Sequence, residues 1–426
     1  MELNKTGSAG GTGGDAWALH EKFIEQLKAA GKLDDPAIED AFRSIPRHLF
    51  LPDMPPEDVY RDAAIPVKMA SAGEAISSSS QPSLMASMLQ QAELRPGQRI
   101  LEIGTATGYN AALLAHIVGP GGEVVTIDID QDLIDSAREH LQAAGYPNVK
   151  AICADGGYGY AEGGPFDRII LTVGASDIAP AWWDQLKPDG LLLIPLTIRG
   201  QFQRMIALRP RDGYLESVSA INCLFVGLRG DYKQADRRQI QIGPEPGIVL
   251  HAGSEGPEPD PDAVHRLLTG PHRDIPVGIS TNEREIGVNL LEWLTTHDPG
   301  LIGIQAMEEL ADSGIVPYLF GIAGKSCFST GLCDSSSLAL LMREPSAVRP
   351  TEPKPQPENV ELWIRSFGDE PLAEELRRRI IEWDSLGRPN DVRMRVRAYR
   401  KGDEVPTGDE LRIEKKHSTL LIDWNG

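Results

Sequence analysis

A glycine-containing segment carries the strongest chemical signal in the sequence. It runs Leu101-Glu-Ile-Gly-Thr-Ala-Thr-Gly-Tyr109, directly after a predicted strand and at the start of a predicted helix. Glycines at 104 and 108 let the backbone turn tightly and approach a ligand that a Cβ would obstruct. The spacing is not the G-x-G-x-x-G of dinucleotide enzymes. We therefore expect a different nucleoside-type cofactor, bound by Glu102, Gly104, Thr105, Thr107, Gly108 and Tyr109.

Acidic residues close the next two predicted strands. Asp128 ends the strand that follows, 24 residues after Gly104, and Asp155-Gly156 ends the one after that. The carboxyl ends of parallel strands form the edge at which such sheets bind ligands. Asp128, with Ile129 beside it, is suited to accept both ribose hydroxyls of a nucleoside, and Asp155 to face an adenine. Signals of this kind without a pyrophosphate-binding pattern favour S-adenosyl-L-methionine over NAD.

Taken singly, each acidic residue also has a plainer interpretation. Glu102 could cap the loop, and Asp128 and Asp155 could be solvated strand ends. The cofactor prediction therefore rests on the three together.

Alternating helices and strands are predicted to position these groups. The pattern predicts helices over 83–94, 109–118, 131–144 and 180–187, and strands over 99–104, 123–129, 149–155, 166–173 and 190–196. Strands separated by helices of this length imply right-handed crossovers and a mostly parallel sheet with helices on both faces. We predict an α/β fold, with a Rossmann-like doubly wound domain over 15–240 that follows a flexible leader over 1–14.

Length and composition limit the function classes. At 426 residues the chain is long enough for two domains, and its net charge of −20, negative in both halves, argues against a nucleic-acid partner. No apolar run approaches the roughly 18 residues of a membrane span, and the N-terminus has no secretory pattern. We therefore expect no membrane partner. The four cysteines form no C-x-x-C pair and have no histidine cluster nearby, so we expect no metal site and a cytoplasmic location.

These motifs resemble a known family. The segment 101–109, the Asp128 strand end, Ala154-Asp-Gly156 and the stretch 166–196 are similar to protein-L-isoaspartate O-methyltransferases, over roughly residues 15–235. The resemblance implies an enzyme that transfers a methyl group from S-adenosyl-L-methionine to a carboxyl oxygen and leaves S-adenosyl-L-homocysteine. Ala106 stands where the family loop, which reads closely as LEIGTGSGY, has a glycine, so we expect the loop to avoid a positive φ there.

A serine-rich segment is the predicted acceptor side. The family has an I-S-x-P segment whose serine lies beside the methyl donor and the acceptor carboxylate; here Ala75-Ile-Ser-Ser-Ser-Ser-Gln-Pro82 is two residues longer. An aspartate carboxylate is ionised at neutral pH and needs no general base, so catalysis would depend on positioning. A flexible serine linker is the alternative. The resemblance assigns the hydroxyl that contacts the carboxylate to Ser80, then Ser79, with Ser77, Ser78 and Gln81 as further substrate contacts.

The second half of the chain has a different pattern. Residues 242–262 are rich in Pro, Gly and acids and predict a connection. Beyond it, helices are predicted over 262–269, 284–297, 303–312 and 370–385, and strands over 315–329, 337–343, 391–400 and 415–424. This mixture predicts a C-terminal α+β domain over 241–426, with peptide recognition as its expected role.

The tail resembles long-tailed relatives that occur with ribosomally synthesised, post-translationally modified peptides (lanthipeptides, lasso peptides and graspetides). In those systems an aspartate of a cyclised peptide is methylated, closes to an aspartimide and then opens to isoaspartate. Arg393, Arg395 and Arg397 alternate with apolar residues, which places three guanidinium groups on one face of a predicted strand that would suit an acidic peptide or be solvated. Trp182 could line the acceptor pocket or pack in the core.

The leading hypothesis is a methyltransferase that esterifies an aspartate side chain in a ribosomally made, cyclised peptide. Its alternative is general repair of isoaspartyl-containing proteins. A third function, an inactive cofactor-binding adaptor of a peptide-modifying complex, is disfavoured because both loop glycines, Asp128 and Asp155 are present. The sequence assigns no oligomeric state.

Overall fold

The computed structural model describes residues 13–71, 73–200, 202–233, 238–244, 247–253, 255–307, 309–310, 313–322, 326–345, 359–390 and 393–424. Most of the predicted leader, residues 1–12, lies outside them. The first helix, α1, runs from Gly13 to Ala29. Its first residue lies slightly before residue 15, the predicted start of the folded region.

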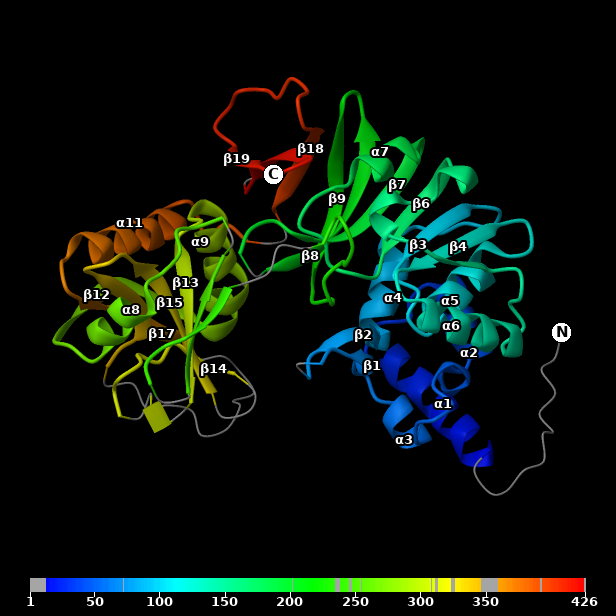
Figure 1. Cartoon of the computed structure of the whole chain (residues 1–426), viewed down its shortest axis with the longest axis horizontal. Helices are drawn as coiled ribbons and strands as arrows, with labels where there is room; N and C mark the ends of the chain where they lie inside the picture. The colour runs from blue at the N-terminus through cyan, green and yellow to red at the C-terminus, as the bar shows by residue number, and fades with distance from the viewer. Residues whose placement is uncertain are drawn as a thin grey trace.

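A ten-stranded sheet forms the larger body, with strands coloured cyan, green and red in Figure 1, in the order β19-β20-β18-β9-β8-β7-β6-β3-β4-β5. Neighbours from β7 to β5 are parallel. These strands are β3 (Arg99–Ile103), β4 (Glu123–Asp128), β5 (Lys150–Cys153), β6 (Phe166–Leu171) and β7 (Leu186–Thr197). Antiparallel β8 (Gln203–Arg211) and β9 (Tyr214–Cys223) continue the sheet beyond β7. The predicted α/β, doubly wound class is confirmed.

Helices cover both faces of this sheet because its central strands are apolar on both sides. Along β7, Leu191 and Leu193 pack into one hydrophobic cluster, and Leu192 and Ile194 into the other. The first cluster includes side chains of α1, α2 (Pro36–Ser44), α4 (Pro82–Gln91) and α5 (Tyr109–Val118). The second includes α7 (Pro180–Asp184) and much of the smaller body. Helix α6 (Gln131–Ala143) connects β4 to β5.

An N-terminal segment leads into the sheet and carries the serines. After α2 come a short 3-10 turn (Arg47–Phe50), α3 (Pro56–Val59) and the hairpin β1 (Ile65–Met69) and β2 (Ala75–Ser79). Asp35 caps α2 by accepting a hydrogen bond from the Ala37 amide at 2.8 Å. The serine segment is thus a paired strand, not the flexible linker that the sequence left open.

The smaller body is an antiparallel sheet in the order β10-β11-β13-β15-β16-β17-β12, with β14 paired to β15. Its strands are β10 (Arg238–Gln241), β11 (Ile248–Ala252), β12 (His272–Asn282), β13 (Leu301–Met307), β14 (Phe320–Ile322), β15 (Ser326–Cys333), β16 (Leu338–Arg343) and β17 (Asn359–Phe367). Its helical elements are α8 (Pro261–Leu268), a π-helical turn (Glu285–Leu290), α9 (Leu291–His297) and α11 (Pro371–Ser385). The predicted helix over 303–312 is wrong for residues 303–307, which belong to β13, whereas residues 309–310 are helical and 308, 311 and 312 lie outside the described residues. Buried side chains there alternate with period two, at Ile302, Ile304 and Ala306, as in a strand.

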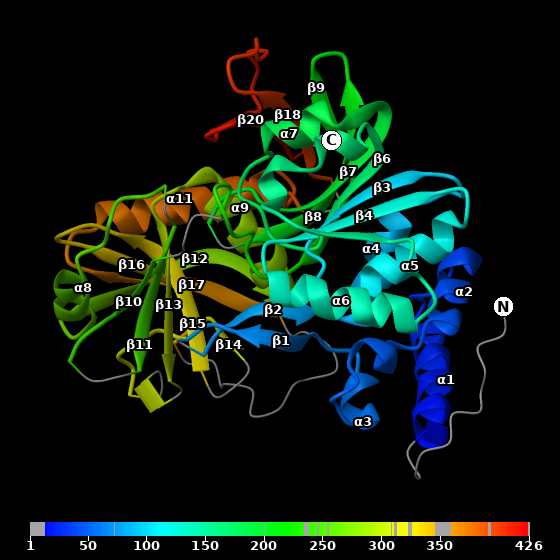
Figure 2. The same ribbon diagram turned by 45° about the vertical axis from the view of Figure 1, so that its right-hand side comes forward.

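The last strands leave the smaller body and return to the first sheet. β18 (Arg395–Arg400), β19 (Leu411–Glu414) and β20 (Ser418–Asp423) extend it beyond β9, with Arg397 opposite Glu216. Figures 1 and 2 both place these red strands beside β9. The predicted C-terminal domain, 241–426, is therefore not one structural unit, because its last strands complete the ten-stranded sheet.

A buried ion pair joins the two bodies. The Arg204 guanidinium of β8 donates to the Glu292 carboxylate of α9, with Nε and Oε1 2.8 Å apart, and neither side chain is more than 2% exposed. Leu208 of β8 and Trp293 of α9 belong to the same hydrophobic cluster. The smaller body is thereby fixed against the sheet that carries the site.

Candidate active site

A pocket opens at the carboxyl edge of β3, β4 and β6. Its lining comes from residues 76–80, 103–107, 109–110, 127–129, 172–173 and 226–229, with Met85 and Gly156. Eleven predicted site residues meet in it: Gly104, Thr105, Thr107, Tyr109, Asp128, Ile129, Gly156, Ser77, Ser78, Ser79 and Ser80.

The cofactor loop is held to β4 by its backbone. The Gly104 and Thr105 amides both donate to the Ile127 carbonyl, at 2.8 and 3.2 Å. Gly104 has φ +108°, and a Cβ there would lie 2.3 Å from Oγ1 of Thr172. Gly108 does not line the pocket; it precedes α5 with φ +85° and packs closely against Ala137 of α6.

Ala106 contradicts one expectation from the sequence. Its φ is +45°, so the loop does adopt a left-handed conformation at this alanine. In that conformation the Ala106 amide donates to Oδ2 of Asp128 at 3.0 Å. The hydrogen bond to a buried carboxylate offsets part of the conformational cost of a non-glycine residue there.

Asp128 presents a nearly buried carboxylate to the pocket. It is 9% exposed and accepts hydrogen bonds from the amides of Ala106 and Asp130, the latter at 3.2 Å. Burial raises the pKa of this carboxyl, and the two amides oppose that shift. Carboxylate oxygens have more lone pairs than two amides use, so Asp128 can still accept hydroxyl donors.

Glu102 supports the loop from beneath instead of lining the pocket. Its fully buried carboxylate accepts from Nδ2 of Asn110 at 2.7 Å and from Oγ1 of Thr126 at 2.5 Å. Burial raises the pKa of Glu102 to about 7. The plainer interpretation of Glu102 as a loop-holding residue matches its position.

Asp155 and Trp182 likewise lie behind the lining. The Asp155 carboxylate accepts from the amides of Gly157 at 2.8 Å and Asp231 at 2.7 Å. Trp182 is 1% exposed, and its Nε1 donates to the Gly156 carbonyl at 2.9 Å. Trp182 therefore holds the Gly156 backbone in place, and the predicted substrate contact at Trp182 is wrong because the ring is in the core.

The serine strand rests on a buried arginine. Nη2 of Arg47, whose side chain is 1% exposed, donates to the Ser79 carbonyl at 3.2 Å, to the Ser79 hydroxyl at 3.3 Å and to the Ser80 carbonyl at 2.9 Å. Gln81 points elsewhere, because its Nε2 donates to Asp62 and to Ser83. The structure therefore brings four serines to the pocket but not Gln81.

The three arginines predicted to contact a peptide are not at this pocket. Arg393 precedes β18, Arg395 is exposed on it, and Arg397 forms an ion pair with Glu410. Between β18 and the pocket strand β3 lie β9, β8, β7 and β6. With neighbouring strands about 4.8 Å apart, this corresponds to roughly 24 Å.

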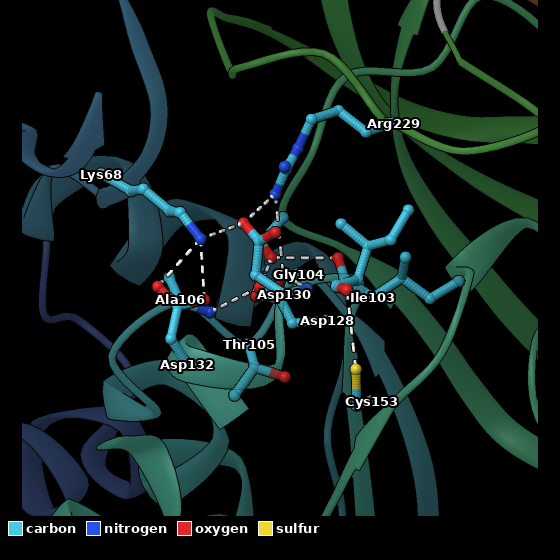
Figure 3. A network of polar contacts seen from close by, with 12 residues as sticks. Lys68, Ile103, Gly104, Thr105, Ala106, Asp128, Asp130, Asp132, Cys153 and Arg229 are labelled. Atoms are coloured by element: carbon cyan, nitrogen blue, oxygen red, sulfur yellow. Dashed lines mark hydrogen bonds and ion pairs between the residues drawn. The ribbon is translucent and has the colours of Figure 1, made fainter. Parts of the chain in front are cut away.

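Sequence reasoning missed one wall of the pocket, the segment Val226–Arg229 that follows β9. Backbone hydrogen bonds to Gly174 hold this wall, from Leu228 N to Gly174 O at 2.7 Å and from Gly174 N to Val226 O at 2.8 Å. Arg229 then pairs with Asp130 at 2.6 Å, across 99 residues of sequence (Figure 3). No local spacing signals such a contact.

The described residues show neither a metal-ion cluster nor a membrane-spanning helix. Within the described ranges, no group of three or more His, Cys, Asp or Glu side chains is arranged to hold a metal ion. No helix among the same residues is both long and apolar enough to cross a bilayer.

The strand order and the pocket define a Rossmann-like α/β protein with a site at the carboxyl edge of its parallel strands. A family model described as protein-L-isoaspartate(D-aspartate) O-methyltransferase matches residues 18–233, half of the chain, and the chain belongs to this family. It is thus a methyltransferase of the isoaspartyl type, which confirms the predicted enzyme class and S-adenosyl-L-methionine as the cofactor of its family.

The chain is also similar to individual proteins. A protein-L-isoaspartate O-methyltransferase of Hyperthermus butylicus is 37% identical over 219 residues, which cover 50% of this chain and 88% of that protein. One of Methanopyrus kandleri is 34% identical over 212 residues, 50% of this chain and 91% of that protein. A solved protein-L-isoaspartate O-methyltransferase structure has a TM-score of 0.48 at 23% identity, covering 89% of this chain and 96% of that one.

Proposed function

We propose that the pocket binds S-adenosyl-L-methionine and that the chain methylates the free carboxylate of an isoaspartyl residue in a protein or peptide. The bound cofactor supplies an electrophilic methyl group. Two features fit its adenosyl part: Gly104, which lines the pocket without a side chain, and the nearly buried Asp128 carboxylate, which is suited to ribose hydroxyls. Gly156 lies in the same lining and is suited to contact the adenine.

The serine strand is the proposed acceptor side. Ser79 is 3% exposed and hydrogen-bonded to Arg47, and Ser80 follows it with its carbonyl on the same guanidinium. Hydroxyls held in this way can orient an acceptor carboxylate without moving. An ionised carboxylate is already a nucleophile, so the chain needs only to orient it and keep water from the site.

The observation that carries the proposal is that Asp128 and the serines Ser77–Ser80 line one pocket. The test is calorimetric titration of the full chain with S-adenosyl-L-homocysteine, followed by turnover on an isoaspartyl peptide. We expect saturable binding and a product heavier by 14 Da, with the normal aspartyl peptide unreactive. Failure to bind the demethylated cofactor would reject the proposal.

A second candidate is methylation of an aspartate in a ribosomally made, cyclised peptide, with subsequent aspartimide and isoaspartate formation. It is favoured by the smaller body, which lies outside residues 18–233 that the family model matches and which the Arg204–Glu292 pair fixes to the ten-stranded sheet. A fixed additional body could select one peptide. The expected products are +14 Da and then −18 Da relative to the unmodified cyclised peptide, with the linear peptide reacting poorly.

The two candidates separate by substrate preference. Fast reaction of short linear isoaspartyl peptides supports repair, whereas reaction only of a cyclised aspartyl peptide supports the biosynthetic role. Cofactor binding without turnover on either substrate would support the adaptor. For either enzymatic role we propose the cytoplasm as the site of action, since all four cysteines are free thiols.

A further inference from the structure

The turn after β4, Asp128–Asp132, holds three carboxylates beside the pocket, and two cations from distant segments bind it (Figure 3). Nη2 of Arg229 lies 2.6 Å from Asp130 and 3.9 Å from Asp128. Nζ of Lys68 lies 3.1 Å from Asp130 and 2.7 Å from Asp132. Asp130 is therefore shared by both cations, which hold its pKa below the ordinary value, Arg229 most strongly.

The two cations come from opposite walls of the pocket. Lys68 lies on β1 directly opposite Ser77 of β2, so it belongs to the hairpin that presents the serines. Arg229 ends the wall Val226–Arg229, which Gly174 holds through two backbone hydrogen bonds. Asp130 contacts Lys68 from the hairpin and Arg229 from the other segment. It follows shortly after Asp128, the last residue of β4.

We propose that Lys68, Asp130 and Arg229 form a positioning bridge, which holds the acceptor serines in register with the donor side of the pocket. The inference rests on the proposed function, because it concerns alignment for methyl transfer. In-line attack depends steeply on geometry, and a misplacement of about 1 Å can reduce a rate on the order of a hundredfold. The hairpin is a two-stranded sheet of its own, so the sheet hydrogen bonds of the catalytic domain do not fix its position.

The bridge is placed to affect alignment more than folding. The side chains of Asp130, Lys68 and Arg229 are 18%, 28% and 33% exposed, so their attractions are partly screened by water and by salt. Their removal leaves the buried clusters of the sheet intact. A change in turnover without a matching change in melting temperature would therefore be the signature of a positioning role.

The first test is Asp130→Asn in the full chain, assayed with S-adenosyl-L-methionine and an isoaspartyl peptide. We expect kcat to fall about tenfold or more, while the dissociation constant of S-adenosyl-L-homocysteine changes less than about threefold and the melting temperature stays within a few degrees. Raising ionic strength should lower the wild-type kcat towards that of the variant and leave the variant nearly unchanged.

The matched control is Glu123→Gln, an acid-to-amide change at the other end of β4, where Glu123 pairs with Arg99 at 3.0 Å in solvent. It should keep wild-type kcat and wild-type salt dependence. Equal losses in Glu123→Gln and Asp130→Asn would overturn the bridge, because the effect would then be that of any exposed ion pair.

The second test places Arg229→Met in the Asp130→Asn background. If Arg229 acts through Asp130, the second change adds less than about a twofold further loss. A large further loss, or weaker S-adenosyl-L-homocysteine binding, would show that Arg229 contacts the ligand itself and would overturn the bridge. Lys68→Arg should retain most of the activity and Lys68→Met should lose it, which repeats the test without altering Asp130.

The proposed function fails separately from the bridge. If the wild-type chain neither binds S-adenosyl-L-homocysteine nor methylates the peptide, the function is wrong. If the wild type is active and Asp130→Asn, Lys68→Met and Arg229→Met all match it, only the bridge is wrong.

Discussion

The cofactor loop, residues 103–109, and the smaller body are held by contacts of different range. Around the pocket, polar contacts join neighbouring strands and turns: Ala106 to Asp128 across 22 residues and Glu102 to Thr126 across 24. The smaller body meets the sheet through Arg204 and Glu292, which are 88 residues apart. The cofactor loop is therefore encoded in neighbouring strands and turns, whereas the placement of the additional body depends on tertiary pairs, as does that of the pocket wall ending in Arg229.

Gly104→Ala is expected to have the largest effect, and it tests the pocket half of the comparison. The new Cβ would lie 2.3 Å from Oγ1 of Thr172 and 2.9 Å from Cγ1 of Val173, at a φ of +108° that side chains rarely adopt. The loop must then move out of the position that faces the ligand. We expect no measurable S-adenosyl-L-homocysteine binding by calorimetry, with circular dichroism still showing a folded chain.

Gly121→Ala is the control, since its Cβ would meet only Gly97 at 3.9 Å. It should bind the ligand normally. Wild-type binding by Gly104→Ala would mean that the ligand does not approach the backbone of this loop.

Glu292→Met tests the other half of the comparison, the attachment of the smaller body to the ten-stranded sheet. It removes the carboxylate that the Arg204 guanidinium, which is 1% exposed, contacts in the interior. Loss of one member of a buried pair costs about 3–5 kcal/mol, because an uncompensated charge remains in the interior. Denaturant unfolding should show a loss of this size in the free energy of unfolding, or a separate early transition of the smaller body.

An exposed pair of the same body gives the control. Arg273, paired with Glu370, is 69% exposed, so Arg273→Met should change the unfolding free energy by less than about 0.5 kcal/mol. If both variants lost equally little, the pair would not be what fixes the smaller body.

The difference in range also explains what could be predicted from the sequence. The glycine loop and Asp128 were predictable because strand, turn and helix follow one another within 30 residues and place both at one edge of the sheet. The positive φ of Ala106 was not, because it depends on the amide hydrogen bond to Asp128 that forms only in the fold.

The wrong predictions share one cause, a tertiary neighbour that the local pattern does not contain. Trp182 packs in the core, where its Nε1 donates to the Gly156 carbonyl. Residues 301–307 form a strand that pairs with β11 on one side and β15 on the other. Arg397 lies on β18, which joins the first sheet, and forms an ion pair with Glu410. Arg229, which no motif marked, lines the pocket for the same reason.

Glu102→Gln should change the pH dependence of stability. Burial raises the folded pKa of Glu102 from the ordinary 4.5 to about 7, so the folded state keeps a proton that the unfolded chain releases. This contribution is fully present below about pH 4.5 and is lost as the pH rises through 7, by up to about 3 kcal/mol at 1.36 kcal/mol per pKa unit. Glutamine carries no such proton.

The measurement is the unfolding free energy of wild type and Glu102→Gln at pH 5 and at pH 8. We expect the difference between the two proteins to shift in favour of the variant at pH 8. Glu123→Gln, at an exposed carboxyl of the adjacent strand, should keep the wild-type slope. A Glu102→Gln slope equal to that of the wild type would show that Glu102 is ionised in the folded state already at pH 5.

Ala106→Gly is expected to have the smallest effect and asks whether the pocket loop stores strain. A non-glycine residue in the left-handed region costs on the order of 1 kcal/mol, and part of the gain on changing it to glycine is offset by the greater freedom of glycine in the unfolded chain. We expect a gain in unfolding free energy of up to about 1 kcal/mol, with S-adenosyl-L-homocysteine affinity within about twofold of wild type. Ala115→Gly, inside α5, should instead destabilise by roughly that amount. If Ala106→Gly destabilised the chain as Ala115→Gly does, the left-handed conformation would cost the alanine no measurable strain.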